Sequence, residues 1–237
     1  MRILNLVLYS DDETYNKMKE YLKEYYDKLD FVKTIYYKYD NAICDTYLLK
    51  DDVLHIKGEE TYIPGILDKT IKAFEYIVNE GIIKDYDYIF RTNISTIVNF
   101  NLLKDQMLNI QMYGGVNVMR LTWLHPEAGI TDHRWNGTYF VSGTCIIFRK
   151  EAIKYIIDYQ HLLERNVIDD VAFGILFTKY LRLKPVSYPA EKWSINRMFV
   201  EDDRNKYLFF RNARNKNNRD FDIENIKNTV SCLSKYC

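Results

Sequence analysis

Three short stretches of the sequence carry polar side chains where a strand ends or a helix begins. RTNISTIVN at 91–99 follows an apolar strand, SGT at 142–144 lies inside another, and two acids at 169–170 precede a helix. In open α/β sheets, ligands bind at the carboxyl ends of the strands, so we expect the three stretches to converge on one site. The glycine of the second stretch would let a ligand or a backbone segment approach closely.

The acids Asp169 and Asp170 support two interpretations. A carboxylate beside a substrate can act as a general base. Carboxylates also favour helix N-termini, where they accept backbone hydrogen bonds and meet the positive end of the helix dipole. The residues alone favour the capping role, although two adjacent acids could divide the work, one capping the helix and the other facing a cleft.

Residues 111–138 differ from the rest because they show no sustained helical or strand periodicity. They contain Gly114 and Gly115, two tryptophans and two histidines. A long loop in a compact domain is usually a binding loop or a lid, so we expect this segment to contribute to a site. Two histidines without cysteines at metal-site spacing do not favour zinc.

The elements that position these stretches begin with a βαβ unit. We predict a strand over 2–9, a helix that Ser10 caps with Glu13 completing a capping box, and a second strand over 31–39. This order favours a parallel, doubly wound sheet. The turn after the first strand reads SDDETYN and has no glycine. That turn disfavours another Rossmann-like enzyme, such as a dehydrogenase or a nucleotidyltransferase.

The later elements continue the alternation of strands and helices, with no internal repeat or linker, which indicates one domain. From Arg204 to Arg219 the chain holds six basic residues and no acid. Periodicity and breaker residues predict a hairpin over 46–58 that turns at 51–52, a helix from Pro64 to near Gly81, a strand over 86–92, a helix over 99–109, a strand over 140–148, a helix over 151–163 and a helix after Asp170.

The composition limits the class of protein. The chain has 237 residues, of which 47% are hydrophobic, so it can bury a substantial core. Its 33 basic and 33 acidic residues balance, which does not favour nucleic acid or an anionic membrane as a partner. No apolar run approaches the roughly 20 residues of a membrane helix, and no signal peptide or cysteine pair with metal or redox spacing stands out. We expect a cytoplasmic protein.

Four motifs in order resemble the GT-A-fold glycosyltransferases, especially the β-1,3-galactosyl- and N-acetylglucosaminyltransferase group. YDYIFRTNISTIVN is similar to the family strand that ends T-D-D-D before V-F-V-N, and GILDKTIKAFEYI is similar to the preceding helix with L-K-T. YFVSGTCIIF is similar to Y-x-x-G-x-G-Y, with Cys145 at the second glycine, and DDVAFG is similar to E-D-V-x-x-G. The resemblance covers about residues 58–175. The whole chain also looks like soluble glycosyltransferase-like proteins of large DNA viruses.

The resemblance implies an α/β fold, GT-A-like and Rossmann-type, with a mixed, mostly parallel central sheet and helices on both faces. It implies a single domain over 1–237. In that domain about 1–110 would bind the nucleotide, about 111–200 would hold the acceptor and the catalytic residues, and the basic tail at about 201–237 would pack as a lid. For a viral protein, the expected location is the host cytoplasm or a virus factory.

The implied activity is transfer of a sugar from a nucleotide sugar, expected to be UDP-linked, to a hydroxyl of a saccharide or a protein. The family's base falls on Asp170, which would take the acceptor's proton while the hydroxyl attacks the anomeric carbon with inversion. Asp169, at the family's glutamate, would orient this base or cap the helix. The acceptor pocket is expected to include Trp123, His133, Trp135, Ser142 and Gly143.

The sequence departs from the family at the three metal-binding aspartates, which fall on Asn93, Ile94 and Ser95. A neutral amide and a hydroxyl are weak ligands for Mn²⁺ or Mg²⁺, so we expect at most a weak site there, an optional cation and no tightly bound cofactor. The leaving diphosphate still needs its charge stabilised, and basic side chains would do this instead. The expected donor-binding residues are Tyr9, Ser10, Lys69, Arg91, Thr92, Asn93, Ser95, Arg211, Arg214 and Arg219.

Two alternatives stay open. The lost aspartates are compatible with a non-catalytic relative that binds a sugar or a nucleotide without turnover. The basic tail is compatible with a solvated segment as well as with a cationic lid over the nucleotide. The expected partners are the nucleotide-sugar donor and a glycan or glycoprotein acceptor, with no nucleic acid and no membrane, and a homodimer is left open.

Overall fold

The first three elements confirm the predicted βαβ unit. In the computed structural model, β1 (Ile3–Leu8) leads through α1 (Glu13–Tyr26) to β2 (Val32–Tyr39), and the two strands pair in parallel. The structure describes residues 1–104, 110–188, 191–193, 198–212 and 219–237.

The predicted cap of the first helix is wrong. Asp12, not Ser10, occupies the N-cap of α1, and its side chain accepts a hydrogen bond from the Tyr15 backbone N–H at 2.9 Å. An N-cap residue needs extended backbone, which Asp12 has. Ser10 therefore belongs to the turn that follows β1 and contributes to the end of the sheet.

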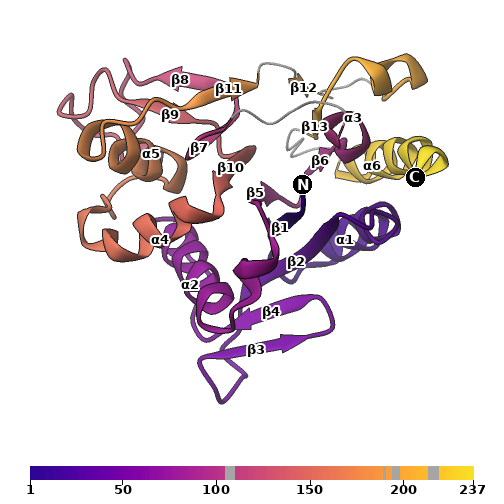
Figure 1. The fold of residues 1–237 in the computed structure, drawn as a ribbon, viewed down its shortest axis with the longest axis horizontal. Coiled ribbons are helices and arrows are strands. Elements are labelled where there is room, and N and C mark those ends of the chain that lie inside the picture. Colours follow the sequence, from indigo (N-terminus) through magenta and orange to yellow (C-terminus); the bar gives the residue numbers. More distant parts are fainter. Residues whose placement is uncertain (105–109, 189–190, 194–197, 213–218) are drawn as a thin grey trace.

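The central sheet contains eight of the described strands in the order β11-β7-β10-β5-β1-β2-β4-β3. β3 and β10 run antiparallel to their neighbours and the other neighbouring pairs are parallel, which confirms the mixed, mostly parallel sheet. The sheet crosses the molecule in Figure 1, with the β3–β4 hairpin at one tip. Its further strands are β3 (Tyr47–Lys50), β4 (Val53–Ile56), β5 (Tyr88–Asn93), β7 (Tyr113–Val116), β10 (Cys145–Arg149) and β11 (Val186–Tyr188).

Helices cover both faces of this sheet and create two apolar cores. One core contains buried residues of α2 (Gly65–Asn79), α4 (Lys150–Asp158) and α5 (Asp169–Gly174). The other core contains buried residues of α1, α3 (Phe100–Lys104) and α6 (Arg219–Leu233), and α1 and α6 lie side by side in Figure 1. The strands supply both cores because successive side chains point to opposite faces of a sheet.

Strand register brings three chain segments to one edge of the sheet. Leu8 at the end of β1 pairs with Asn93 at the end of β5, and Cys145 at the start of β10 pairs with Thr92. Because β10 runs in the opposite direction, the turn at 142–144 lies at the same edge as the carboxyl ends of β1 and β5. This is the edge at which α/β sheets bind ligands.

The segment predicted as a long loop contains more regular structure than expected. Within 111–138 lie β7, β8 (Val118–Arg120) and a short 3₁₀-helix at Pro126–Ala128. The strand predicted over 140–148 is also wrong as a single element, because it divides into β9 (Tyr139–Val141) and β10. β9 pairs with β8 in a separate two-stranded sheet. Strands of three or four residues are too short to produce a periodicity, so the sequence pattern does not show them.

The predicted hairpin over 46–58 and the helix from Pro64 are confirmed by β3, β4 and α2. Other predicted helices end earlier or change type. α3 lies within the predicted 99–109, of which residues 105–109 lie outside the described residues. The helix predicted over 151–163 is α4 followed by a 3₁₀ turn at Gln160–Leu162, and α5 continues as a π-helix over Ile175–Tyr180. A 3₁₀ turn at Ile82–Asp85 precedes β5.

The C-terminal region forms a third sheet and the last helix. β13 (Phe209–Arg211) pairs with β12 (Glu191–Trp193) on one side and with β6 (Thr96–Val98), just after β5, on the other. Short 3₁₀ turns at Glu201–Asn205 and Ser234–Tyr236 flank this region. Among the described residues, no helix is long and apolar enough to cross a membrane.

Candidate functional site

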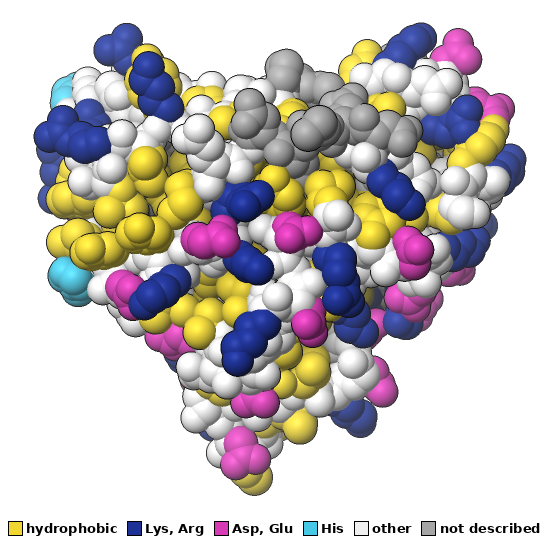
Figure 2. Space-filling model, viewed as in Figure 1, with side chains coloured by type: hydrophobic (Ala, Val, Ile, Leu, Met, Phe, Trp, Pro, Cys, Tyr) yellow, Lys and Arg dark blue, Asp and Glu magenta, His cyan; other side chains and the backbone are white. Residues whose placement is uncertain are grey.

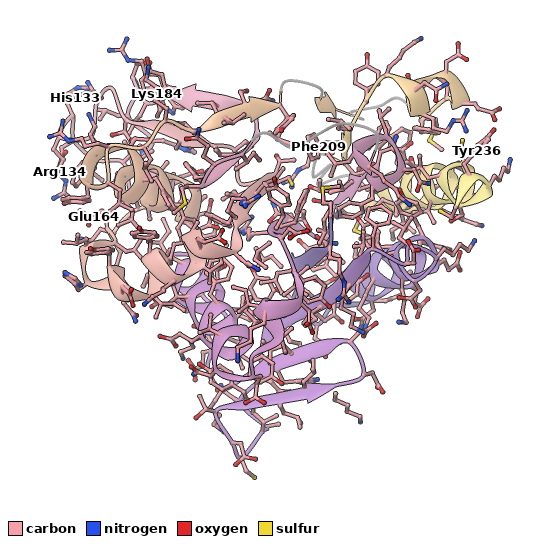
Figure 3. The ribbon with its side chains drawn as sticks, viewed as in Figure 1. His133, Arg134, Glu164, Lys184, Phe209 and Tyr236 are labelled. Carbon is pink, nitrogen blue, oxygen red and sulfur yellow. The ribbon has the colours of Figure 1, made fainter. Side chains whose placement is uncertain are left out.

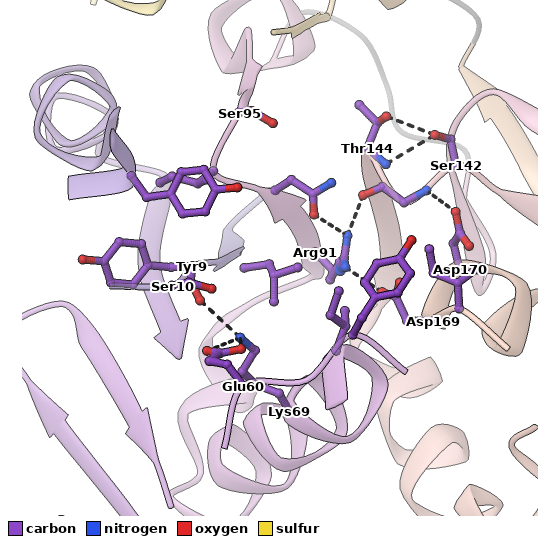
Figure 4. Close-up of a pocket in the computed structure, with 18 of the residues that line it drawn as sticks. Tyr9, Ser10, Glu60, Lys69, Arg91, Ser95, Ser142, Thr144, Asp169 and Asp170 are labelled. Carbon is purple, nitrogen blue, oxygen red and sulfur yellow. Dashed lines mark hydrogen bonds and ion pairs between the residues drawn. The ribbon is translucent and has the colours of Figure 1, made fainter. Parts of the chain in front are cut away.

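A cavity of about 660 Å³ opens at the carboxyl edge of the central sheet. The end of β1, the end of β5, the turn before β10 and the start of α5 line it, so the three polar stretches of the sequence do converge. Figure 4 shows Arg91 near its centre, with Asp169 and Asp170 on one side and Tyr9 and Ser10 on the other. Ligand-binding pockets commonly measure about 300–1,000 Å³, so the cavity can hold a small-molecule substrate.

Charged side chains of both signs gather around this cavity, as Figure 2 shows across the middle of the face. Arg91, on β5, is 2% exposed, and Asp169, at the start of α5, is 3% exposed. The Arg91 Nη2 lies 2.6 Å from the Asp169 Oδ2. Burying either charge alone would cost several kcal/mol, and the pairing offsets that cost.

Arg91 has two further partners through its other terminal nitrogen. The Arg91 Nη1 donates hydrogen bonds to the Asn93 Oδ1 at 2.8 Å and to the Gly143 carbonyl oxygen at 2.5 Å. The guanidinium therefore links β5, the turn before β10 and the start of α5. The capping role considered for Asp169 is not what the structure shows, since no side chain makes a capping bond at the N-cap Ile168 and Asp169 faces Arg91.

Asp170 lies beside this ion pair and is partly exposed to the cavity. Its Oδ2 accepts a hydrogen bond from the Gly143 N–H at 2.9 Å, and its Oδ1 accepts one from the Val171 N–H at 2.8 Å. Burial and the adjacent charge of Asp169 raise the pKa of Asp170 from 3.8 to about 7, against the opposing effects of the Gly143 N–H and Arg91. A carboxyl with such a pKa can exchange a proton near neutral pH.

Lys69, on α2, forms a second ion pair at the floor of the cavity. Its side chain is 1% exposed, and its Nζ lies 2.6 Å from the Glu60 Oε2 and 3.2 Å from the Tyr9 carbonyl oxygen. Burial lowers the pKa of the Lys69 ammonium, and the Glu60 carboxylate opposes this shift. Glu60 was not predicted as a site residue, because the loop before α2 gives no spacing that would pair it with Lys69.

Two arginines of the C-terminal region, Arg211 on β13 and Arg219 on α6, form a second wall of the cavity. The Arg211 Nη1 donates a hydrogen bond to the Thr96 Oγ1 at 3.1 Å, and the Arg219 Nη1 lies 2.7 Å from the Asp222 Oδ2. The Arg219 guanidinium also lies over the Tyr15 ring, 5.5 Å from its centroid. Both arginines are partly exposed and line the cavity. Arg214, predicted with them, lies outside the described residues.

Most other predicted site residues also line the cavity, but four do not. Thr92 is fully buried and its Oγ1 donates to the Asn5 Oδ1 at 3.1 Å. Trp123 packs on Phe140, and Trp135 packs on Tyr180, outside the lining. His133 lies at the outer edge of the molecule (Figure 3). The lining also includes residues that were not predicted to bind a substrate: Leu8, Tyr15, Glu60, Thr61, Tyr62, Ile66, Ile94, Thr144 and Ile168.

The end of β5 does not fit a divalent cation. The Asn93 Oδ1 accepts its hydrogen bond from the positively charged Arg91, and Ile94 beside it is apolar. A divalent cation needs several oxygen ligands, preferably anionic ones. Among the described residues, no group of three His, Cys, Asp or Glu side chains is placed to hold a metal ion.

The sheet order, the helices on both faces and the cavity at the carboxyl ends define a GT-A-like α/β fold. The solved structures that resemble it include a glycosyltransferase involved in the glycosylation of the major capsid of PBCV-1, with a TM-score of 0.55 and 10% identity over 94% of this chain and 100% of that one. The catalytic domain of Drosophila β1,4-galactosyltransferase 7, in complex with xylobiose, is more distant, with a TM-score of 0.42 and 12% identity over 78% of this chain and 64% of that one. Comparison with protein-family models and with curated proteins finds no match.

Proposed function

We propose that the chain is a glycosyltransferase that moves a sugar from a nucleotide sugar to a hydroxyl of a saccharide or a protein. The observation that carries this proposal is Asp170. Its carboxyl faces a cavity of about 660 Å³ at the substrate-binding edge of the sheet, with its pKa raised to about 7. The fold, which resembles solved glycosyltransferases, supports the same class of reaction.

In the proposed mechanism the reaction is a single displacement with inversion at the anomeric carbon. The acceptor hydroxyl oxygen forms a bond to that carbon while the bond from the carbon to the donor's phosphate oxygen breaks. The nucleoside diphosphate leaves with the electron pair, and the ionised Asp170 takes the hydroxyl proton. Because the carboxylate accepts hydrogen bonds from the Gly143 and Val171 N–H groups, it has a fixed orientation for this transfer.

We assign the donor's nucleotide to the part of the cavity between the end of β1 and the wall that carries Arg211 and Arg219. Tyr9 and Tyr15 offer aromatic rings there, and the partly exposed Arg211 and Arg219 offer positive charge for a diphosphate. We propose a UDP-linked donor. We also propose that the reaction does not require a divalent cation, because the end of β5 offers neutral side chains next to a guanidinium. Basic side chains then stabilise the charge of the leaving group.

The test is a panel of UDP-sugars and other nucleotide sugars, each offered with mixed glycan acceptors in the presence of manganese or of a chelator. Release of nucleoside diphosphate and formation of a glycosylated product are both measured. The expected result is transfer from one donor that survives chelation. Transfer that requires manganese would refute the metal-independent mechanism, but the proposed glycosyltransferase activity would stand.

A second candidate function is a non-catalytic module that binds a sugar or a nucleotide. It is favoured by the neutral residues Asn93, Ile94 and Ser95 at the end of β5, where the Asn93 Oδ1 accepts a hydrogen bond from Arg91. This candidate predicts that a nucleoside diphosphate raises the melting temperature while no donor is turned over with any acceptor.

A further inference from the structure

We propose that Arg91 is a positioning residue for the base Asp170, which it reaches through Gly143 and Asp169, and that it is not a ligand of the donor's diphosphate. This inference rests on the proposed function, because it assigns Arg91 a role in the same reaction. It replaces the expectation from the sequence that Arg91 compensates for missing metal charge.

Gly143 connects the two side chains through its own backbone. Its carbonyl oxygen accepts a hydrogen bond from the Arg91 Nη1 at 2.5 Å, and its N–H donates to the Asp170 Oδ2 at 2.9 Å. The turn around it is closed by the Thr144 N–H, which donates to the Ser142 Oγ at 3.3 Å. A shift of the Arg91 guanidinium therefore moves the Gly143 N–H, which orients the Asp170 carboxylate.

The position of Gly143 leaves little room for adjustment. A Cβ atom at this residue would lie 3.1 Å from the Asp170 Oδ2 and 3.5 Å from its Cγ. A side chain here would therefore press on the carboxylate oxygen and shift it slightly from its present position. Arg91 holds the turn from the side of β5, and Asp170 meets it from the side of α5.

Arg91 also sets the electrostatic environment of the base. Its Nη2 pairs with the Asp169 Oδ2 at 2.6 Å, so it anchors the first residue of α5 and offsets the charge next to Asp170. The charged groups that act on Asp170 are Asp169 and Arg91. The phenols of Tyr62 and Tyr113 also lie within range, and their pKa values are raised, chiefly by burial, so neither phenol ionises near neutral pH.

The same contacts argue against a role as a phosphate ligand. Arg91 is 2% exposed, its charge is offset by an almost fully buried carboxylate, and its two terminal nitrogens contact three partners. A phosphate oxygen would have to displace Asn93, the Gly143 carbonyl or Asp169, and loss of either of the last two contacts would disturb the base. Arg211 and Arg219, whose guanidinium groups donate hydrogen bonds to Thr96 and Asp222, are partly exposed and line the cavity.

The first test compares Arg91→Lys with Arg149→Lys in the full chain. Lysine keeps the charge but not the planar fork that reaches Gly143 and Asp169 together. Arg149 lies at the far end of β10, does not line the cavity, and pairs with Glu151 at 3.6 Å, so it is the matched control. We expect Arg91→Lys to lower kcat about 100-fold with the donor KM within about 3-fold, since a misplacement near 1 Å can cost that much. Arg149→Lys should have the kcat and the donor KM of the parent protein.

The pH dependence of transfer separates positioning from a general loss of structure. In Arg91→Lys the negative charge of Asp169 is less well compensated, which should raise the pKa of Asp170. The rise of kcat with pH should therefore move to higher pH by about half a pH unit or more. A phosphate ligand predicts instead a donor KM raised about tenfold or more with an unmoved pH profile. That second pattern would overturn the inference.

A second variant protects the test against misfolding of Arg91→Lys. Gly143→Ala keeps the Arg91–Asp169 pair and places a methyl group against the Asp170 carboxylate. It should show the same signature of lower kcat, unchanged donor KM and a shifted pH profile. If the parent protein shows no transfer at all, the proposed function fails, but titration of the Asp170 carboxyl by NMR still decides the inference. A pKa that is the same in the parent and both variants would overturn it.

Discussion

The two walls of the cavity hold their charges in different ways. On the wall formed by β5, the turn before β10 and α5, Arg91 and Asp169 are almost fully buried and paired at 2.6 Å, with Asp170 beside them. On the wall formed by β13 and α6, Arg211 and Arg219 are partly exposed. The comparison indicates that basic residues lining the same cavity are not interchangeable. Arg219 also pairs with a carboxylate, Asp222, so exposure is what separates the two walls: a buried arginine fixes geometry, whereas a partly exposed one can contact an incoming anion.

The largest effect should come from removing the carboxylate of the first wall. We expect Asp170→Asn to lower kcat by about 10²–10⁴-fold, because proton transfer by a positioned base contributes that much. Asp30→Asn, at an exposed carboxylate between α1 and β2, is the matched control and should keep full activity. Rates are measured at saturating donor. Activity of Asp170→Asn within a few-fold of the parent would remove Asp170 as the base.

A smaller effect should come from the second wall. Arg211→Gln removes a charge that can contact the diphosphate, and we expect the Kd for UDP to rise about 10-fold, which corresponds to about 1.4 kcal/mol. Isothermal titration calorimetry measures this, with Arg149→Gln as the control because Arg149 does not line the cavity. If Arg211→Gln binds UDP as the parent does and instead shows a pH profile like that expected of Arg91→Lys, the contrast between the walls is wrong.

The raised pKa of Asp170 also predicts a modest effect on stability. Its pKa in the folded state, about 7, lies above the ordinary 3.8, so the folded state binds a proton more tightly and loses stability as pH rises from about 4 to 7. Asp170→Asn lacks this loss. We therefore expect its melting temperature, relative to the parent, to be several degrees higher at pH 8 than at pH 5. Thermal melts at both values check this, and a difference that is equal or falls with pH would contradict the raised pKa.

The smallest expected effect is that of metal. Because the Asn93 amide oxygen already accepts a hydrogen bond from Arg91, we expect a chelator to change the transfer rate by less than about 2-fold. Dialysis against a chelator followed by readdition of manganese measures this. A rate that recovers only on readdition of manganese would contradict this prediction and the metal-independent mechanism.

Local patterns in the sequence predicted the frame of the site. The βαβ unit, the helix from Pro64 and the strand before Asn93 come from apolar periodicity and breaker residues, and all three are confirmed. The general tendency of α/β sheets to bind ligands at one edge then predicted the convergence of 91–99, 142–144 and 169–170, which the cavity shows. The resemblance to a known family singled out Asp170 rather than Asp169.

The charge pairing within the site could not be predicted in this way. Arg91 and Asp169 are far apart in the chain, and Glu60 reaches Lys69 from a loop, so no spacing rule links either pair. The division of the predicted strand at 142–144 was missed because Ser142, Gly143 and Thr144 lie between two short apolar runs that read as one. Sequence periodicity reports which face of an element is buried, and it does not report which partner a buried charge meets.

The most direct test of sugar transfer with Asp170 as base is the pH–rate profile of the parent protein and of Asp170→Asn, measured side by side with a chelator present. The base acts only when ionised, so kcat of the parent should rise with an apparent pKa near 7, and the residual rate of Asp170→Asn should lack that rise. The same rise in both proteins, or a rate that does not change between pH 5.5 and 8.5 in the parent, would contradict the assignment.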